Sequence, residues 1–529
     1  MAIAASAPVV IAGAGPVGLS LAVGLAHHGV RSVVLEESPA LSEHSKAPGI
    51  LPRTLEILAG WGLLDRFVDR GFFLRQIRAW TPRRDEPLFT VDLSPLEPVT
   101  SAAGVLILPQ SRTEQLLYES ARSSGLVDVR FGHRVTGVVE DPSGVTVATE
   151  TGDRGQPQFR GTFVVGCDGP HSAVRQTLGL SLEGKTYPAR LLLADVRVGE
   201  PRNSLQWPRL SARDRNAFGG IRIDRDLWRL IATLDKKTTD DDATSAPFVA
   251  KLVETLLGDG PFELVWASTF SIHCRTSPQF RRGRVVLAGD AAHINSPAGG
   301  QGMNSGIQDA HNISWKLARA LAGGNVEALL ASYEAERRPA ILTNVDRYTD
   351  LLTRGVLLAP QVLRLGVLGL ARLALRIPPM TSRTLRRAGM LDTRYEESPL
   401  ISGRGDLPGT RAPNARLARD GVPLRLHDLV TRGDAALLLF DDGRLPGWDV
   451  QNLVRRLQGV EGIRVVRVAA SSSAAMSGDF VDVDGTVWSE LRLRPGTAAL
   501  VRPDAHIGWI AERPTADELV SGVSRAVGR

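Results

Sequence analysis

The sequence predicts an α/β, multidomain fold that is built on a parallel sheet and carries an inserted, mostly antiparallel second domain. Its 529 residues correspond to about three or four domains at roughly 150 residues each. Apolar strand candidates lie at 8–12, 32–35, 162–166 and 284–288, and the first two flank a helical segment, as in a βαβ unit. Residues 181–275 instead contain tryptophans and short alternating stretches, which favour antiparallel strands.

The composition is that of a globular protein, with 43% apolar and 23% charged residues. Lys and Arg number 63 against 57 Asp and Glu, without long runs of like charge, so neither a nucleic-acid partner nor a membrane partner is expected. Cys167 and Cys274 cannot form a disulfide framework, and no Cys/His cluster has metal-ligand spacing. We therefore expect no metal and a reducing, cytoplasmic compartment.

Two apolar segments resemble targeting or membrane sequences only superficially. The N-terminus has no Lys or Arg before Arg31, so it lacks the charged region of a signal peptide and reads as a first strand. Arginines and a proline interrupt the apolar stretch 351–376. That stretch is therefore expected to be a packed or amphipathic helix and not a membrane span.

The first predicted unit is the strand at 8–12, a helix at 16–28 and the strand at 32–35. A GxGxxG pattern lies between strand and helix, formed by Gly13, Gly15, Pro16, Val17 and Gly18. Such a turn presents backbone N–H groups and the positive end of the helix to a pyrophosphate, and Glu36 ends the second strand where it can bind a ribose. These residues predict a Rossmann-like domain that binds a dinucleotide; the alternative is a structural glycine-rich turn.

Two further motifs follow the later strand candidates, CDGPHSAVR at 167–175 and GDAAHINSPAGGQGMN at 289–304. Asp290 is placed to hydrogen-bond a polyol, with a helix cap as the alternative. The glycines of 297–302 let the backbone approach a planar ring, and the helix that begins near Met303 directs its positive end at that ring. No second GxGxxG follows a strand, which disfavours a simple hydride-transferring dehydrogenase.

The C-terminal part of the chain predicts a separate domain. The helix expected over 302–322, with one apolar or small face, belongs with the sheet that it follows, and the Gly- and Pro-rich segment 396–414 is typical of a linker into the last domain. Strands are expected at 435–440, at 463–469 and near 498–510, with a helix around 449–458. A last helix is opened by Thr515, with Glu518 in capping-box spacing; Ser111 and Glu114 predict a similar box earlier in the chain.

The turn at 13–18 and the motifs at 167–175 and 289–304 follow one another as in the FAD-dependent aromatic hydroxylases, which the chain resembles. These are single-component flavoprotein monooxygenases of the para-hydroxybenzoate hydroxylase fold, and the resemblance is greatest to the bacterial polyketide-tailoring branch. The segments PRTLEIL (52–58), QSRTE (110–114), DAHNISWK (309–316) and YEAERRP (333–339) support the resemblance. It covers essentially the whole chain and implies FAD as cofactor, NAD(P)H as transient co-substrate and O2. It implies an FAD-binding domain in two parts, residues 1–180 and residues 276–395, the second of which carries long helices. Residues of about 73–100 are assigned either to the first part or to the substrate domain. The substrate-binding domain is residues 181–275, and a thioredoxin-like domain follows at 405–529.

The resemblance also implies residue roles. Asp168 and Gly169 belong to the pyrophosphate and nicotinamide region, Gln110 and Arg112 to the ribityl-phosphate, and the backbone of Val135 to the adenine. With the motif residues, the expected flavin contacts are Gly13, Gly15, Pro16, Val17, Gly18, Glu36, Gln110, Arg112, Val135, Asp168, Gly169, Asp290, Pro297, Gly299, Gly300, Gln301, Gly302, Met303 and Asn304. Candidates for the substrate pocket are Trp207, Arg222, Trp228 and Phe270.

Some positions depart from the family pattern or carry no assigned chemistry. The family usually has Arg or Lys where this chain has Glu37, and Arg-Ala where it has Lys46-Ala47, in a loop expected to move with the flavin. Lysine keeps the charge but loses the planar fork of arginine. No residue is assigned as catalytic base, and His293 is expected to be structural. Since no cysteine follows Cys274, the thioredoxin-like domain is expected to serve packing or assembly.

The expected activity is hydroxylation of a polycyclic, polyketide-like aromatic ring through a flavin C4a-hydroperoxide, in natural-product (antibiotic) biosynthesis. Two alternatives stay open: Baeyer–Villiger oxidation or epoxidation on the same fold, and a non-catalytic carrier that retains the dinucleotide fold. The natural substrate, the choice between NADH and NADPH and the oligomeric state, monomer or homodimer, are also open at this stage.

Overall fold

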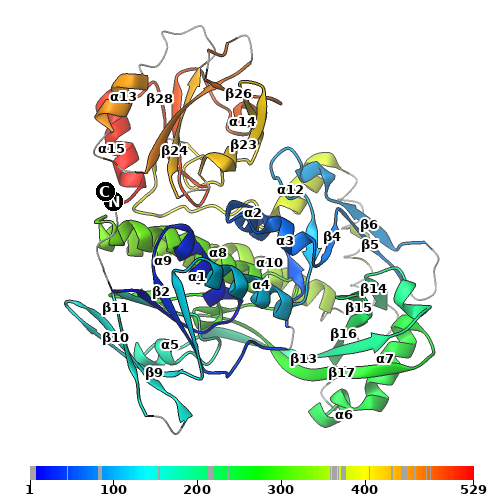
Figure 1. Cartoon of the computed structure of the whole chain (residues 1–529). Helices are drawn as coiled ribbons and strands as arrows, with labels where there is room; N and C mark the ends of the chain where they lie inside the picture. Colours follow the sequence, from blue (N-terminus) through cyan, green and yellow to red (C-terminus); the bar gives the residue numbers. More distant parts are fainter. Residues whose placement is uncertain are drawn as a thin grey trace.

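Figure 1 shows the computed structural model of the chain, whose described residues are 7–43, 46–81, 86–152, 155–211, 218–235, 237–357, 359, 366, 369–370, 377–403, 405–430, 433–441, 450–457, 460, 462–471, 474–476 and 478–529. Most of the 351–376 stretch lies outside these ranges, so the expectation for it concerns residues that are not described. Among the described helices, none has the length and apolarity that crossing a membrane requires.

The first sheet has the strand order β18-β19-β12-β1-β2-β8. Neighbouring strands from β19 to β8 run parallel, whereas β18 is antiparallel to β19. The strands are β1 (Val9–Ala12), β2 (Ser32–Glu36), β8 (Val127–Phe131), β12 (Phe163–Gly166), β18 (Arg281–Arg282) and β19 (Val285–Leu287). The β1 sequence is continuously apolar because helices and loops bury both faces of a parallel sheet. All four strand candidates predicted for this sheet are confirmed.

Helices cover this sheet and join it to the rest of the molecule. Helix α1 (Pro16–His27) packs against α8 (Gly302–Leu321) and α4 (Gln110–Ser123), and α9 (Val326–Ala340) packs against α8. A Cβ atom on Gly306 would lie 2.4 Å from Cγ2 of Val17, so the absent side chain lets α1 and α8 approach closely. Figure 1 shows α8 and α9 between the first sheet and the C-terminal domain.

The second large sheet is antiparallel throughout, in the order β14-β15-β16-β13-β17-β20. Its strands are β13 (Glu183–Val198), β14 (Arg209–Ser211), β15 (Phe218–Arg222), β16 (Leu227–Leu234), β17 (Phe262–Thr276) and β20 (His293–Ile294). Helices α6 (Asp240–Thr244) and α7 (Ala246–Leu257) cover one face with an apolar core. Since β20 directly follows the β19 turn of the first sheet, the two sheets meet beside Asp290.

Smaller elements fill the space around these sheets. Two three-stranded sheets contain β3 (Gly49–Ile50), β4 (Phe72–Leu74) and β7 (Val105–Ile107), and β9 (Arg134–Asp141), β10 (Gly144–Glu150) and β11 (Gln158–Gly161). A two-stranded sheet pairs β5 (Gln76–Ala79) with β6 (Phe89–Asp92). The short helices are α2 (Pro52–Gly60), α3 (Leu64–Val68), α5 (Ala173–Thr177), α10 (Asp346–Leu352) and α12 (Pro378–Ala388).

The C-terminal domain is an eight-stranded mixed sheet in the order β21-β28-β27-β24-β25-β26-β22-β23. Its elements are β21 (Ser402–Gly403), β22 (Arg416–Arg419), β23 (Val422–Arg425), β24 (Ala435–Asp441), β25 (Ile463–Ala469), β26 (Phe480–Asp482), β27 (Thr497–Val501), β28 (Ile507–Glu512), α13 (Val450–Arg456), α14 (Thr486–Glu490) and α15 (Ala516–Ala526). The capping box of Thr515 and Glu518 is confirmed. The expected linker differs in one respect, because β21 within it pairs with β28 as an edge strand.

Candidate functional site

The three predicted motifs meet at one edge of the first sheet, where parallel strands end side by side. The N–H of Gly13 donates to Leu35 O (2.7 Å), that of Cys167 to Ala12 O (2.8 Å) and that of Ala288 to Gly166 O (2.9 Å). The turns after β1, β12 and β19 are therefore neighbours. An open α/β sheet binds ligands at this edge.

Of the three glycines in the turn after β1, only Gly15 has free space where a side chain would stand. Gly13 has φ +97°, and a Cβ there would lie 2.5 Å from Cys167 O. A Cβ on Gly18 would lie 2.0 Å from Gly13 O, whereas one on Gly15 would meet no atom within 4 Å. The turn thus keeps free space in front of Gly15 and the first N–H groups of α1, which fits a pyrophosphate.

Carboxylates stand on both sides of this turn. The half-buried Glu36 accepts hydrogen bonds from Ala14 N (2.7 Å) and Ser38 N (2.9 Å). Asp168 accepts one from Val174 N (3.2 Å) through Oδ2, but its Oδ1 is buried without a partner, and burial raises the pKa of this carboxyl. A buried acceptor without a donor is rare in folded proteins, so Asp168 fits a ligand that supplies a hydroxyl or N–H.

Asp290 lies in the short helical turn Gly289–Ala291 directly after β19. Its side chain is open to solvent, yet the surrounding protein desolvates the carboxyl and raises its pKa, while His293 and Lys46 act in the opposite direction. An accessible carboxylate at this position can accept hydrogen bonds from a polyol.

The loop before α8 is placed as the sequence predicts, but its residues differ in accessibility. Pro297, Gly299 and Gly300 are exposed, and α8 begins at Gly302. Asn304 is fully buried: its side-chain amide donates to Gly49 O and Gly300 O and accepts from Leu51 N. Its side chain therefore holds the loop, and Gln301 and Met303 are also buried, which leaves backbone N–H groups as the possible contacts.

The residues of α4 differ from the prediction. The helix starts at Gln110 after Pro109, and the Ser111–Glu114 capping box is wrong because Ser111 already lies inside the helix. Glu114 instead accepts a hydrogen bond from Gln110 Nε2 (2.9 Å), whose Oε1 accepts one from Ala47 N (3.1 Å). Gln110 therefore joins α4 to the loop that carries Lys46.

Three further residues predicted to contact the flavin, Arg112, Val135 and Gly169, differ in how accessible they are to a ligand. Arg112 is exposed on the same helix, and Val135 is buried in β9. Gly169 has φ +74° and open space where a Cβ would stand, which allows close approach of a ligand.

Glu114 supports a prediction on pH dependence. It is only 3% exposed, and burial raises its pKa to about 7, helped by Glu36 and opposed by Gln110 and Lys46. The unfolded carboxyl releases its proton near pH 4.5, before the folded one does, so the free energy of unfolding should fall as the pH rises from 4.5 to 7. Glu114→Gln should therefore stabilise the cofactor-free protein at pH 8 by up to about 3 kcal/mol and much less at pH 5. Urea unfolding at the two pH values measures this; an equal gain at both would contradict it.

Sequence reasoning missed two residues that connect the motifs. Arg175 donates to Pro170 O (2.7 Å) and Ala291 O (3.0 Å), and so joins the turn of Asp168 to that of Asp290. Asp309 accepts hydrogen bonds from Gly289 N (3.0 Å) and from Nε2 of His293 (2.7 Å). Both residues stand inside segments that carry the family resemblance, but spacing alone did not indicate their contacts.

The four predicted pocket residues do not share one surface. Trp228 is fully buried in the core beneath α7, so its prediction as a pocket wall is wrong: its side chain points to the helix-covered face of the sheet. Phe270 pairs with Leu191 in the second sheet and is half-buried. Trp207 and Arg222 both contact Phe72 of β4, with ring centroids 5.6 Å apart for Trp207 and the guanidinium 4.7 Å from the ring for Arg222.

Comparison with known proteins gives matches along the whole chain. A family model described as an FAD binding domain matches residues 6–348, and one described as the C-terminal domain of aromatic-ring hydroxylases matches 405–529. Rifampicin monooxygenase of Streptomyces venezuelae is 31% identical over 522 residues, 95% of each chain. The 12-dehydrotetracycline 5-monooxygenase/anhydrotetracycline 6-monooxygenase of Streptomyces rimosus is 34% identical over 523 residues, 96% of each chain. A solved ternary complex of aklavinone-11 hydroxylase with FAD and aklavinone has a TM-score of 0.78 at 26% identity, covering 99% of both chains.

Proposed function

Because the chain belongs to the FAD-dependent aromatic-ring hydroxylases, a family of flavoprotein monooxygenases, we propose that it hydroxylates a polycyclic aromatic substrate in natural-product biosynthesis, with O2 and NAD(P)H. Family membership makes the chain an enzyme, in place of the non-catalytic carrier. The single observation that supports the proposal best is the convergence of the Gly15 turn, Asp168 and Asp290 at one sheet edge.

The residues that would hold FAD follow from the space and the partners that this edge offers. The open position at Gly15 and the start of α1 would receive the pyrophosphate, with Glu36 at the ribose. Asp168 Oδ1, which has no partner, would accept from the cofactor, and Asp290 would accept from the ribityl chain. The exposed Gly299 and Gly300, with the backbone at the start of α8, would lie against the ring system.

The bound flavin would supply the redox chemistry, in which electrons from NAD(P)H reduce O2, one oxygen atom enters the aromatic ring and the other leaves as water. The protein would orient the substrate and exclude bulk water. Phe270 in β17 and the group of Trp207, Arg222 and Phe72 at the edge of the second sheet offer aromatic surface for a planar substrate. Aklavinone and tetracycline precursors are the polycyclic compounds in the names of relatives.

The direct test is the visible spectrum of the purified protein, followed by NADPH and NADH oxidation in air with and without a panel of polycyclic phenols. We expect bound-flavin absorption bands and an oxidation rate that an aromatic compound increases. Product structure by NMR then distinguishes ring hydroxylation from Baeyer–Villiger insertion or epoxidation. A protein that binds no FAD, or oxidises NAD(P)H without any oxygenated product across the panel, would refute the proposed activity.

A further inference from the structure

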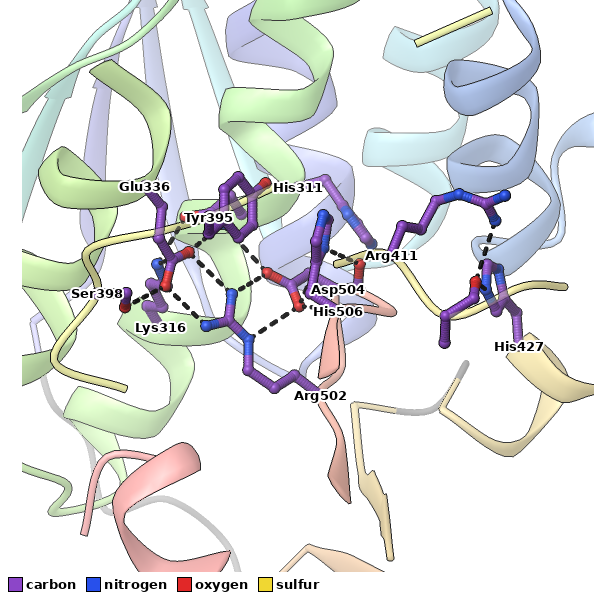
Figure 2. A network of polar contacts seen from close by, with 12 residues as sticks. His311, Lys316, Glu336, Tyr395, Ser398, Arg411, His427, Arg502, Asp504 and His506 are labelled. Atoms are coloured by element: carbon purple, nitrogen blue, oxygen red, sulfur yellow. Dashed lines mark hydrogen bonds and ion pairs between the residues drawn. The ribbon is translucent and has the colours of Figure 1, made fainter. Parts of the chain in front are cut away.

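A cluster of buried charges joins the C-terminal domain to helices α8 and α9. Arg502, Glu336, Asp504 and Lys316 are each at most 1% exposed. Arg502 binds Glu336 through two hydrogen bonds of 2.7 and 2.8 Å and also pairs with Asp504. Lys316 Nζ lies 2.7 Å from the same Glu336 carboxylate. Two positive charges thus meet two negative ones, as Figure 2 shows.

The C-terminal contribution to this cluster is one short segment between β27 and β28, Arg502–His506. It reaches α9 through Glu336 and α8 through Asn312, whose Nδ2 donates to Asp504 Oδ2 (3.1 Å) and to Glu336 Oε2 (2.8 Å). Although burial acts to raise the pKa of Glu336, Arg502 and Lys316 outweigh it and lower that pKa to about 2. The Glu336 carboxylate therefore stays ionised at neutral pH and keeps its two bonds to Arg502, whereas burial lowers the pKa of Lys316 to about 8.

The same segment touches a second buried chain of contacts that leads toward the flavin site. The ring of His506 stacks on Tyr395 with centroids 4.1 Å apart. The Tyr395 hydroxyl accepts a hydrogen bond from Arg337 NH1 (3.4 Å), and Arg337 Nε donates to Asp309 Oδ1 (2.7 Å). Figure 2 shows Tyr395 directly beside His506 and Arg502.

Asp309 and Arg337 bind the two backbone segments that face the proposed flavin position, which are the Asp290 turn and the first turn of α8. Asp309 fixes the turn on either side of Asp290, through the N–H of Gly289 (3.0 Å) and Nε2 of His293 (2.7 Å). Arg337 NH2 donates to Ser305 O (3.2 Å) in the first turn of α8. A displacement of Arg337 would consequently shift the Asp290 turn and the start of α8 relative to each other.

We infer that the Arg502–His506 segment positions the Asp290 turn for FAD, acting through Tyr395, Arg337 and Asp309; this inference rests on the flavin role proposed above. The C-terminal domain thereby contributes to cofactor affinity without touching the cofactor. A purely architectural role would require only that the domains stay attached, to which the ion pair of Arg386 with Glu490 also contributes.

The test compares variants of the full-length protein in FAD titrations, with thermal unfolding measured in parallel. Arg502→Gln removes both charged hydrogen bonds to Glu336 and the ion pair with Asp504, so we expect about tenfold weaker FAD binding and an altered flavin spectrum. Arg502→Lys restores the charge without the fork and should recover part of the affinity. The control is Arg386→Gln, because Arg386 also binds the C-terminal domain through two 2.7 Å bonds to Glu490. Among the residues that the structure describes, no such chain of contacts leads from Arg386 to Asp309, so this variant should leave FAD affinity within twofold of wild type.

The outcomes separate this inference from the proposed function. If wild type binds FAD and folded Arg502→Gln binds it equally well, the positioning role is overturned and the flavin site stands. If wild type binds no FAD, both fail. Should Arg502→Gln not fold, Tyr395→Phe decides, because it removes only the hydroxyl next to Arg337: we expect about threefold weaker FAD binding, and unchanged affinity would overturn the inference.

Discussion

Asp290→Ala should yield a stable protein that binds FAD roughly 30- to 150-fold more weakly than wild type, because a charge-assisted hydrogen bond contributes about 2–3 kcal/mol. Asp290 is exposed in the turn after β19, and desolvation by the surrounding protein raises the pKa of its carboxyl. Its removal therefore costs the fold little and can raise the melting temperature of the cofactor-free protein slightly. Fluorescence titration of the cofactor-free protein with FAD measures the loss.

Asp290→Asn is the matched comparison, since the amide keeps the shape and one acceptor oxygen but not the charge. We expect its FAD affinity to fall between those of Asp290→Ala and wild type. Stoichiometric FAD at wild-type affinity in Asp290→Ala would remove Asp290 from the binding site.

Gly15→Ala should weaken the affinity for FAD by about a hundredfold or more, which corresponds to roughly 3 kcal/mol of binding free energy. The stability of the cofactor-free protein should not change. The position has φ −71°, which any residue adopts, and its Cβ would meet no protein atom within 4 Å. The new methyl group would occupy only the space in which we place the pyrophosphate. Equal melting temperatures with and without the substitution, together with lost FAD affinity, are the expected pair of results.

Gly18→Ala is the informative contrast three residues later. Its Cβ would lie 2.0 Å from Gly13 O, so the backbone must move, at a cost of about 1–3 kcal/mol. We expect both stability and FAD binding to fall. If Gly15→Ala bound FAD as wild type does, the pyrophosphate would have to lie elsewhere, whatever Gly18→Ala does.

The sequence predicted those features that local chemistry determines. Gly13 was identifiable because its backbone conformation requires glycine, and Thr515 because its cap forms within one turn of helix. Trp228 was misplaced because alternation along a strand separates two faces without saying which one a helix covers. Ser111 was wrongly predicted to cap α4, because Pro109 is the residue before the helix and Gln110 is already its first residue.

Contacts between distant segments were beyond such reasoning. Arg502 meets Glu336 across 166 positions, and neither residue lies in a spacing pattern that announces a partner. The placement of Asp309 against Gly289 depends on how α8 packs on the first sheet, which is a property of the folded chain. Arg175 illustrates the intermediate case, since its motif was recognised but its two carbonyl acceptors were not.

The order of the strands in the first sheet also governs how the enzyme is made. β1 and β12 are synthesised before strands β13 to β17 of the antiparallel sheet, whereas β19, the Asp290 turn and α8 follow those strands. On the ribosome, α1 is consequently exposed without its α8 partner until more than half of the chain has emerged, and domains fold largely in order of synthesis. The proposed FAD site is therefore completed only after the Asp290 turn and α8 have been synthesised, so insertion of FAD is expected to be a late event in biogenesis.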